Sequence, residues 1–378
     1  MTRMIAGLTA ERVRGDIDVL SRAGLDLDHF VQEAVGAVGR AVPWVGACVG
    51  THDPASLMLT SARKYGALTP NRDDDLLFGQ LEYGFGEFTS FRSLVHHDIR
   101  AVSMLQLPKD VVDGSPRTHQ LIRPVYGFTD EARLLMRDDT GMWGCLALFR
   151  DDGAPFAEDD LTFLESLSAA FARGVRSGIL TRLGAAETEA PSARGPAVVV
   201  VNAAGEIAQI SRGATQVLEE LATLGDAGAP YGIIAGMASA ARAMATDSEV
   251  PLPTARLRMP SGHWQVLHAS PMDGPDGATG DVVVTIEEAR PPEIVALVVA
   301  AFGLTPRERE VTRMVLQGCD TKAIAVALHV SAYTVQDHLK SVFAKAGVRS
   351  RRDLIARVYF DQYVPRMGAA VGPAGFFM

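Results

Sequence analysis

The chain has 378 residues, a length that predicts two or three domains rather than one. Hydrophobic residues make up 47% and charged residues 21%, a composition typical of globular proteins with ample material for cores. The net charge of −9 argues against a protein that coats nucleic acid or an acidic membrane along its whole length.

Targeting signals and paired cysteines are missing from the sequence. Its start lacks the apolar segment of a signal peptide, and the purest apolar runs, at 197–201 and 294–302, are too short for a membrane span. Cys48, Cys145 and Cys319 are scattered, which argues against a disulfide framework or a cysteine-based zinc site. We therefore expect a cytoplasmic protein with no membrane partner.

The first half of the chain mixes helical and strand patterns. Apolar residues recur at helical spacing up to residue 40, and strands are expected at 45–50, 57–60, 132–136 and 142–150. A helix over 155–178 carries acids in its first turn and an apolar stripe, which suits either core packing or a dimer seam. The stripe consists of Leu164, Leu167, Phe171, Val175 and Ile179. Residues 66–130 show few clear periods and receive no assignment.

A second unit follows a segment rich in Ala, Gly, Glu and Pro that predicts a linker. Strands are expected at 197–202, 206–211, 255–259, 264–270 and 281–287, with a helix at 213–224, which together indicate a small α+β domain. A short connecting helix is expected at 294–302. The last 18 residues are mostly Gly, Ala and Pro and predict a frayed tail.

Residues 305–360 have the clearest local signals in the chain. Thr305 to Glu308 form a capping box with Pro at the first helical position, and Gly318 is suited to end that helix. A short helix at 322–328, capped by Asp320 or Thr321, precedes a third helix that Ser331 caps and Gly347 ends. A last helix opens at 350–353. Four short helices with tight turns predict a helix-turn-helix unit.

Charge separates this unit from the rest of the chain. Residues 303–357 contain ten Lys and Arg against five Asp and Glu, a net charge of +5, which leaves −14 for the remainder. A basic module attached to an acidic body is typical of localised phosphate binding.

The helical module closely resembles the LuxR-type helix-turn-helix domain. The resemblance is carried by the run from Leu304 to Val311, Gly318, Lys322-x-Ile-Ala325, Thr334-Val-x-x-His-Leu339 and Lys345-x-Gly347-Val348. It implies a transcriptional regulator that binds double-stranded DNA, usually as a homodimer. An imperfect palindrome is then the expected site. A contact with RNA polymerase is a further candidate partnership.

The resemblance also implies which residues approach DNA. Lys322 and Thr334 are expected near phosphates, and Gln336, Asp337 and Lys340 in the major groove, where Gln pairs with adenine and Asp accepts from cytosine. The family often has Lys in place of Gln336, so we expect unusual specificity and lower electrostatic affinity. Asp337 is alternatively a solvated residue that touches no base. Arg349, Arg351 and Arg352 are further cationic candidates.

Two looser resemblances concern the front of the chain. Residues 25–178 resemble a GAF domain through Gly127-Phe-Thr-Asp-Glu131, the run 141–150 and the run 155–161, and residues 197–289 are similar to a PAS domain at their first and last strands. The expected fold is therefore multidomain, with an α+β GAF-like sensor, an α+β PAS-like middle domain and an all-α four-helix C-terminal domain. Its expected divisions are 1–24 (N-terminal helical extension), 25–178, 179–196 (linker), 197–289, 290–303 (connecting helix), 304–360 and 361–378 (tail).

A sensor of this kind offers an apolar pocket for a small-molecule effector. Candidate lining residues, each of which also suits an ordinary core, are Trp44, Cys48, Phe85, Trp143 and Cys145. The sequence identifies no cofactor and no metal site, because His96, His97 and His119 are isolated loop histidines. It also contains no Walker A loop and no nucleophile elbow, so we expect no enzyme and no catalytic residue.

Three functions fit these observations. The first is a transcription factor whose front domains sense a small molecule or mediate dimerisation. The second is a constitutive DNA-binding protein whose front domains serve only oligomerisation or partner recruitment. The third is an enzyme with an accidental helical tail.

Overall fold

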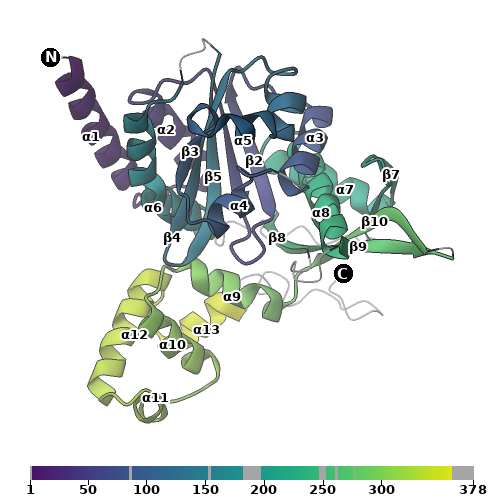
Figure 1. Cartoon of the computed structure of the whole chain (residues 1–378). Helices are drawn as coiled ribbons and strands as arrows, with labels where there is room; N and C mark the ends of the chain where they lie inside the picture. Colours follow the sequence, from purple (N-terminus) through teal and green to yellow (C-terminus); the bar gives the residue numbers. More distant parts are fainter. Residues whose placement is uncertain are drawn as a thin grey trace.

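The computed structural model describes residues 2–84, 87–151, 155–181, 197–246, 253–259, 263–275 and 277–359. Two α+β units, each built on a five-stranded antiparallel sheet, precede an all-helical unit (Figure 1). This is the fold class that the sequence predicts. The predicted tail at 361–378 and most of the predicted linker lie outside the described residues.

The first sheet has the strand order β2-β1-β5-β4-β3. Its strands are β1 (Gly46–His52), β2 (Leu59–Gly66), β3 (Ala101–Ser103), β4 (Asp130–Asp138) and β5 (Gly141–Arg150). The predicted strands at 45–50, 132–136 and 142–150 are confirmed. The partner expected at 57–60 is β2, which begins at Leu59 and continues to Gly66. It does not begin at 57 because Leu57 has a φ of 60°, which is outside the β region.

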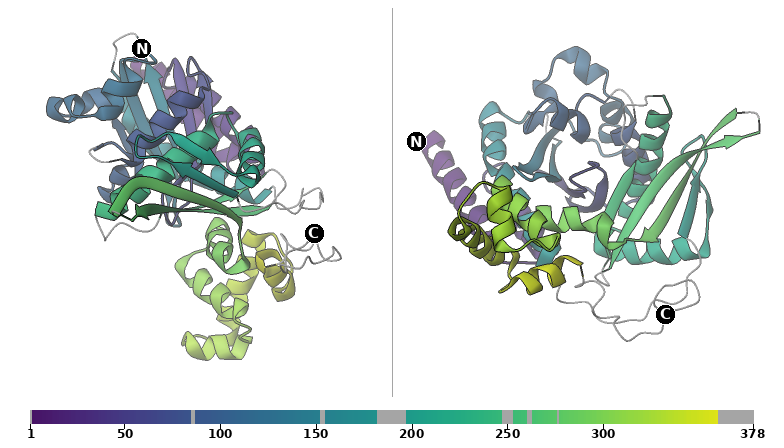
Figure 2. Two further views of the ribbon diagram at one scale, coloured as in Figure 1. Left: turned by 90° about the vertical axis from the view of Figure 1, so that its right-hand side faces the viewer. Right: turned by 90° about the horizontal axis from the view of Figure 1, so that it is seen from below.

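Helices cover both faces of this sheet (Figures 1 and 2). One face carries α1 (Thr2–Leu20), α2 (Leu27–Gly39) and α6 (Glu158–Thr181). The other carries α3 (Arg72–Tyr83), α4 (Phe91–His96) and α5 (Lys109–Asp113). The last three lie in the stretch that sequence patterns left unassigned, since they are short and α3 begins with three consecutive acids rather than an apolar stripe.

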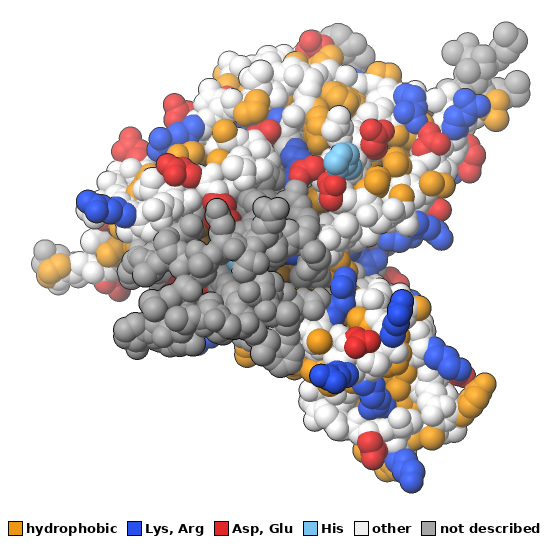
Figure 3. Space-filling model, turned by 180° about the vertical axis from the view of Figure 1, so that it is seen from behind, with side chains coloured by type: hydrophobic (Ala, Val, Ile, Leu, Met, Phe, Trp, Pro, Cys, Tyr) orange, Lys and Arg blue, Asp and Glu red, His pale blue; other side chains and the backbone are white. Residues whose placement is uncertain are grey.

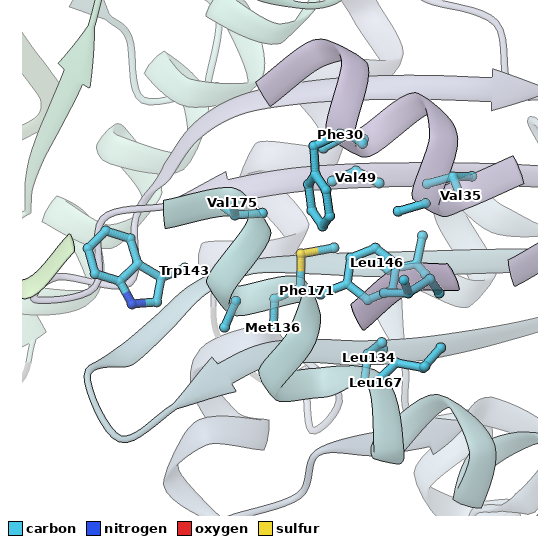
Figure 4. Close-up of a cluster of buried hydrophobic side chains, with 14 of the residues drawn as sticks. Phe30, Val35, Val49, Leu134, Met136, Trp143, Leu146, Leu167, Phe171 and Val175 are labelled. Atoms are coloured by element: carbon cyan, nitrogen blue, oxygen red, sulfur yellow. The ribbon is translucent and has the colours of Figure 1, made fainter. Parts of the chain in front are cut away.

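The apolar stripe on α6 is part of the hydrophobic core. Leu164, Leu167, Phe171 and Val175 are fully buried against the sheet and α2, and Ile179 is half-buried (Figure 4). The rings of Phe30 and Phe171 meet edge to face with centroids 5.9 Å apart. A Cβ at position 174 would lie 2.0 Å from the Phe30 ring, so Gly174 is what allows α2 and α6 to approach. The dimer-seam interpretation of this stripe is therefore wrong.

The second sheet has the order β7-β6-β10-β9-β8 and confirms all five predicted strands. They are β6 (Ala197–Val201), β7 (Ile207–Ile210), β8 (Thr254–Arg258), β9 (Trp264–Gly274) and β10 (Gly277–Glu288). The predicted helix at 213–224 is α7 (Arg212–Leu221), continued by one tight turn. The sequence did not predict α8 (Ala229–Thr246), because its residues are mostly small and apolar on all sides and therefore form no amphipathic stripe.

The two α+β units pack together through α3 and α8. A Cβ at position 79 would lie 2.2 Å from the carbonyl oxygen of Gly232 and 2.8 Å from the nitrogen of Gly236. Glycine on both helices therefore lets their backbones touch. This contact places a helix of the second unit beside the α3 face of the first sheet.

The C-terminal helices follow α9 (Pro291–Ala301), which matches the predicted connecting helix. They are α10 (Pro306–Leu316), α11 (Thr321–Ala327), α12 (Ala332–Ala346) and α13 (Arg351–Tyr359). Together with α9 they form a separate lobe below the sheets (Figure 1). Their shared core includes Val311, Ile324, Val335, Val342 and Leu354, all fully buried.

Candidate nucleic-acid interface and ligand cavity

Local capping signals set the boundaries of the C-terminal helices. Glu308 accepts the Thr305 N–H at 2.8 Å while Thr305 Oγ1 accepts the Glu308 N–H at 3.3 Å, which confirms the capping box. Asp320 caps α11, and Ser331 caps α12 by accepting the Thr334 N–H at 3.0 Å. Gly318 and Gly347 end helices at φ values of 85° and 65°, which favour glycine. These local signals set where α11 begins and where α12 begins and ends.

Glu308 also holds α12 against α10. Its carboxylate is buried and accepts from Ser341 Oγ and from Lys345 Nζ, both at 2.6 Å. Burial opposes ionisation, yet the hydrogen bonds from Lys345, Ser341 and the Thr305 amide lower the pKa of Glu308 to about 2. Helical spacing predicts that Ser341 and Lys345 lie on the outward face of α12. Lys345 is exposed and Ser341 is half-buried, and the polar ends of both side chains reach this carboxylate.

The outward face of α12 carries side chains with few partners in the protein. Gln336 and Asp337 are exposed, and Lys340 Nζ lies 3.4 Å from Asp337 Oδ1 in a solvated pair. Such exposed pairs contribute little to stability. Tyr333 is 70% exposed one turn earlier, and the sequence analysis did not select it as a site residue. An exposed tyrosine in the first turn after the Ser331 cap is the signal that could have found it.

Most of the other predicted DNA-contact residues are at least partly exposed, whereas Arg351 is hydrogen-bonded within the lobe. Lys322 is exposed in the first turn of α11, and Thr334 is half-buried, with Oγ1 2.9 Å from Ser331 Oγ. Arg349 and Arg352 are exposed around the start of α13. Arg351 instead donates to the Cys319 carbonyl at 2.7 Å and to Thr321 Oγ1 at 2.9 Å, so it braces the turn before α11.

Basic side chains exceed acidic ones on the visible face of this lobe in Figure 3. On the face seen in Figure 3, Lys and Arg outnumber the acidic side chains on the C-terminal lobe, whereas both signs are interspersed over the sheets. The tertiary structure thus presents the local excess of positive charge on one surface.

A cavity lies on the α3 face of the first sheet. The space in it that a water-sized molecule can enter is about 50 Å³. Cys48 of β1 and Cys145 of β5 line it together with apolar side chains such as Phe78 and Phe149. Burial raises the pKa of Cys48 to about 12 and that of Cys145 well above its ordinary value, so both thiols stay protonated and act as apolar lining.

The remaining predicted pocket residues do not line this cavity. Trp143 lies on the opposite sheet face, packed near Val175 of α6 (Figure 4). Strand alternation would put Trp143 on the same face as Cys145, but the β4–β5 register shifts between Met136 and Arg137. This bulge turns Trp143 away. Trp44 packs beside the same α2–α6 core, and Phe85 lies outside the described residues.

Buried charges form a network at one wall of the cavity. Arg117, with no exposed surface, donates to Glu131 at 2.9 Å and to Thr89 at 2.6 Å, and it lies 3.3 Å from Glu82. Arg133 donates to Glu131 and Glu82 at 2.8 and 2.9 Å. Burial opposes ionisation of Glu131, but the two guanidinium groups lower its pKa below the ordinary value. The sequence did not predict this network. The charged residues Glu131 and Arg133, which stand between apolar neighbours, are the signal that could have indicated it.

A second cavity lies where the three parts of the chain meet. Its lining comes from β1, α6, β8 and α9 and includes His52, whose pKa burial lowers to about 3. Asp53 beside it accepts from Arg256 Nε at 2.7 Å and Nη2 at 2.5 Å, and Arg256 also donates to the Glu293 carbonyl at 3.0 Å. One arginine therefore ties the first unit, the second unit and α9 together.

The described residues contain neither a metal-binding cluster nor a membrane-spanning helix. Across the part of the chain that the structure describes, no group of three or more His, Cys, Asp and Glu is arranged to hold a metal ion. Within the same residues, no helix combines the length and apolarity needed to cross a bilayer.

The capped helices, the tight turn and the exposed basic face define a helix-turn-helix protein. The model of the bacterial regulatory proteins of the luxR family matches residues 303–358. The spore germination protein GerE of Bacillus subtilis is 38% identical over 55 residues, which are 15% of this chain and 74% of that protein. This chain therefore belongs to the luxR family of bacterial regulatory proteins.

Other relatives match the same segment. The monoamine regulon transcriptional regulator of Klebsiella aerogenes is 43% identical over 56 residues, 15% of this chain and 25% of that protein. An HTH-type transcriptional regulator of Mycobacterium bovis is 52% identical over 52 residues, 14% of this chain. The chain spans about 6% of the length of that mycobacterial relative, so the likeness concerns the C-terminal helices alone.

Among solved structures, a Vibrio cholerae VqmA dimer without target DNA is 15% identical and covers 44% of this chain and 84% of that chain, at a TM-score of 0.21. A Vibrio cholerae VqmA–ligand–DNA complex is 21% identical and covers 30% of this chain and 58% of that chain, at a TM-score of 0.16. TM-scores this low carry no argument about the front units.

Proposed function

We propose that this chain regulates transcription by laying α12 into the major groove of double-stranded DNA, under the control of its front domains. The observation that carries the proposal is the unengaged outer face of α12 on a lobe that is basic while the rest of the chain is acidic. Because Val335, Leu339 and Val342 fill the core, Gln336, Asp337 and Lys340 are left exposed on the opposite side of the helix.

Specific roles follow from chemistry and exposure. Gln336 offers an amide that pairs bidentately with adenine, and Tyr333 lies one turn ahead of it. Lys322, Lys340, Arg349 and Arg352 supply phosphate contacts, with Thr334 as a hydroxyl donor. Asp337 stays solvated beside Lys340 and weakens non-specific attraction to the duplex. Arg351 acts through the turn before α11 that it braces.

We assign the front units to GAF-like (25–178) and PAS-like (197–289) domains, between an N-terminal helical extension (1–24) and a connecting helix (290–303) that leads to the DNA-binding domain (304–360). Support comes from topology, because numbering the strands within each sheet gives the same order, 2-1-5-4-3, in both. Related sensor folds would share such an order. The tie from Asp53 through Arg256 to α9 supports control of the lobe by these units.

A dimer on an imperfect palindrome follows from the helix-turn-helix geometry, since two copies would place two α12 helices about one DNA turn apart. RNA polymerase is the further partner that a transcription activator of this kind would contact.

The experiment uses the full chain and DNA sites selected from random duplexes. Lys322→Ala and Lys340→Ala are each expected to weaken binding uniformly across sequences and to reduce the salt slope by about 1. Lys109→Ala, an exposed lysine on α5, is the matched control and should change neither quantity. An unchanged slope in both test variants would contradict the proposed interface.

A further inference from the structure

Among the described residues, the two most exposed large hydrophobic side chains lie on either side of the turn between α11 and α12. Val326 of α11 is 75% exposed and Tyr333 of α12 is 70% exposed. Single apolar side chains are common on protein surfaces. Tyr333 is distinguished by its position, because it lies in the first turn of the helix that we propose to enter the major groove. The N-terminal residues of such a helix are the ones that contact base edges.

Tyr333 does not help to hold its own helix in place. The cap of α12 is made by Ser331, whose Oγ accepts the Thr334 N–H at 3.0 Å, and Val335 is the first residue of the helix to enter the core. No hydrogen bond or ring contact joins Tyr333 to another described residue. In addition, α11 lies at the end of the lobe farthest from the sheets (Figure 1), so the front units do not cover the start of α12. The ring is therefore open to a partner from outside the chain.

The exposed charges on this part of α12 cancel each other. Tyr333, Gln336, Asp337 and Lys340 follow one another at helical spacings of three and four residues, so they share one side of the helix. The first two are neutral, and Lys340 Nζ lies 3.4 Å from Asp337 Oδ1. A face without net charge discriminates between base pairs by hydrogen bonds and apolar contacts rather than by attraction to phosphates.

Thymine provides the apolar group that an aromatic ring can meet in the major groove. Each A·T pair presents the 5-methyl group of thymine there, whereas a G·C pair presents only hydrogen-bonding groups. Gln336 follows Tyr333 by three residues, which is about 4.5 Å along the helix axis. This distance is close to the rise of about 3.4 Å between successive base pairs. The ring of Tyr333 and the amide of Gln336 are thus spaced to meet neighbouring base pairs.

We infer that Tyr333 is a specificity-determining residue that selects thymine, through contact of its ring with the 5-methyl group, at the base pair next to the one that Gln336 reads. The inference rests on the proposed insertion of α12 into the major groove and adds the base that the groove has to present. Each half-site of the DNA then contains a thymine whose methyl group contributes to binding.

The test removes the methyl group from the DNA. The full chain is titrated with its selected duplex, in which each thymine is replaced in turn by deoxyuridine, a base with the same hydrogen-bonding groups. One replacement in each half-site is expected to weaken binding about fourfold, which corresponds to about 0.8 kcal/mol for one buried CH₂ group. Unchanged affinity after every replacement, or a selected half-site without thymine, would overturn the inference.

Three variants assign the methyl contact to a side chain. Tyr333→Phe keeps the ring and should keep the fourfold preference for thymine over deoxyuridine. Tyr333→Ala should bind the two duplexes equally. Val326→Ala shortens a side chain of comparable exposure on the neighbouring helix and is the matched control, which should keep the preference. Urea unfolding should be unchanged in all three, because both positions are exposed.

Two results with these variants would contradict the role of Tyr333. A preference that persists in Tyr333→Ala would assign the methyl group to another residue. An equal loss of affinity for both duplexes in Tyr333→Phe would show that the hydroxyl group binds a phosphate instead.

The salt dependence of binding separates this inference from the proposed function. Binding whose salt slope falls in Lys340→Ala, with equal affinity for the thymine and deoxyuridine duplexes, would keep the proposed interface and contradict the role of Tyr333. No binding to any duplex would contradict the proposed function itself and, with it, the inference.

Discussion

The C-terminal lobe and the first sheet handle their charges in opposite ways. The lobe exposes Gln336, Asp337 and Lys340 to solvent and buries one carboxylate, Glu308, for packing. The first sheet buries two arginines with three glutamates. Surface charges suit a partner that arrives from outside, such as a phosphate backbone, whereas buried charges fix the shape of an enclosed cavity. The two regions are thus built for partners of different size.

The largest effect is expected where the buried network is broken. Arg117→Met removes the guanidinium that lies among Glu82, Glu87 and Glu131, so uncompensated carboxylates remain in the interior. We expect a loss of about 3–5 kcal/mol in the unfolding free energy of the front units, measured by urea unfolding. Arg12→Met on the exposed side of α1 is the control. Equal losses of unfolding free energy in the two variants would show that the buried network does not stabilise the front units.

A smaller effect is expected at the tie between the units. Asp53→Asn keeps the shape of the side chain but removes the charge that Arg256 binds, at a cost of about 2 kcal/mol. Limited proteolysis and urea unfolding should then show the first and second units melting apart. Asp16→Asn, in an exposed pair with Arg40, should leave both readouts unchanged. A single unchanged transition would contradict the coupling.

Glu308 gives the corresponding test within the lobe. Its folded pKa lies below the ordinary value of 4.5, so its stabilisation is complete above about pH 4.5 and is lost as the pH falls towards 2. Glu308→Gln should cost about 2 kcal/mol at pH 7, less than the full pKa shift implies because Lys345 is partly exposed, and almost nothing near pH 2. Glu310→Gln, in an exposed pair, is the control. A pH-independent loss would contradict this account.

The smallest stability effect is expected at Asp337. Asp337→Asn should change the unfolding free energy by less than about 0.5 kcal/mol, because its pair with Lys340 is solvated. DNA affinity should rise several-fold for all sequences, measured by titration of labelled duplexes, since a carboxylate leaves the DNA-facing surface. Glu165→Gln on exposed α6 surface serves for comparison. A loss confined to sites with one particular C·G pair would instead show that Asp337 reads a base.

Prediction from sequence succeeded where neighbouring residues decide the structure. Thr305, Gly318, Ser331 and Gly347 act within one helical turn, so the helix boundaries of the lobe could be predicted from their spacing. Every strand of the two sheets except β3 was also predicted, although the strand order was not. Prediction from sequence failed at α8, because this helix depends on packing against its neighbours and has no amphipathic pattern of its own.

Of the two candidate sites, the outer face of α12 follows from local sequence and the cavity does not. The sequence alone determined which residues face out from α12, because helical periodicity settles orientation once the cap is placed. The bonds from Ser341 and Lys345 to Glu308 were not determined in this way, since only the folded lobe brings Glu308 within their reach. The cavity depended on tertiary structure throughout. A bulge at Trp143 turns it to the sheet face opposite Cys145, and Arg133 and Asp75 line one cavity only because β4 and α3 pack together. Local spacing does not determine which residues far apart in the chain meet, so these contacts appear only in the folded molecule.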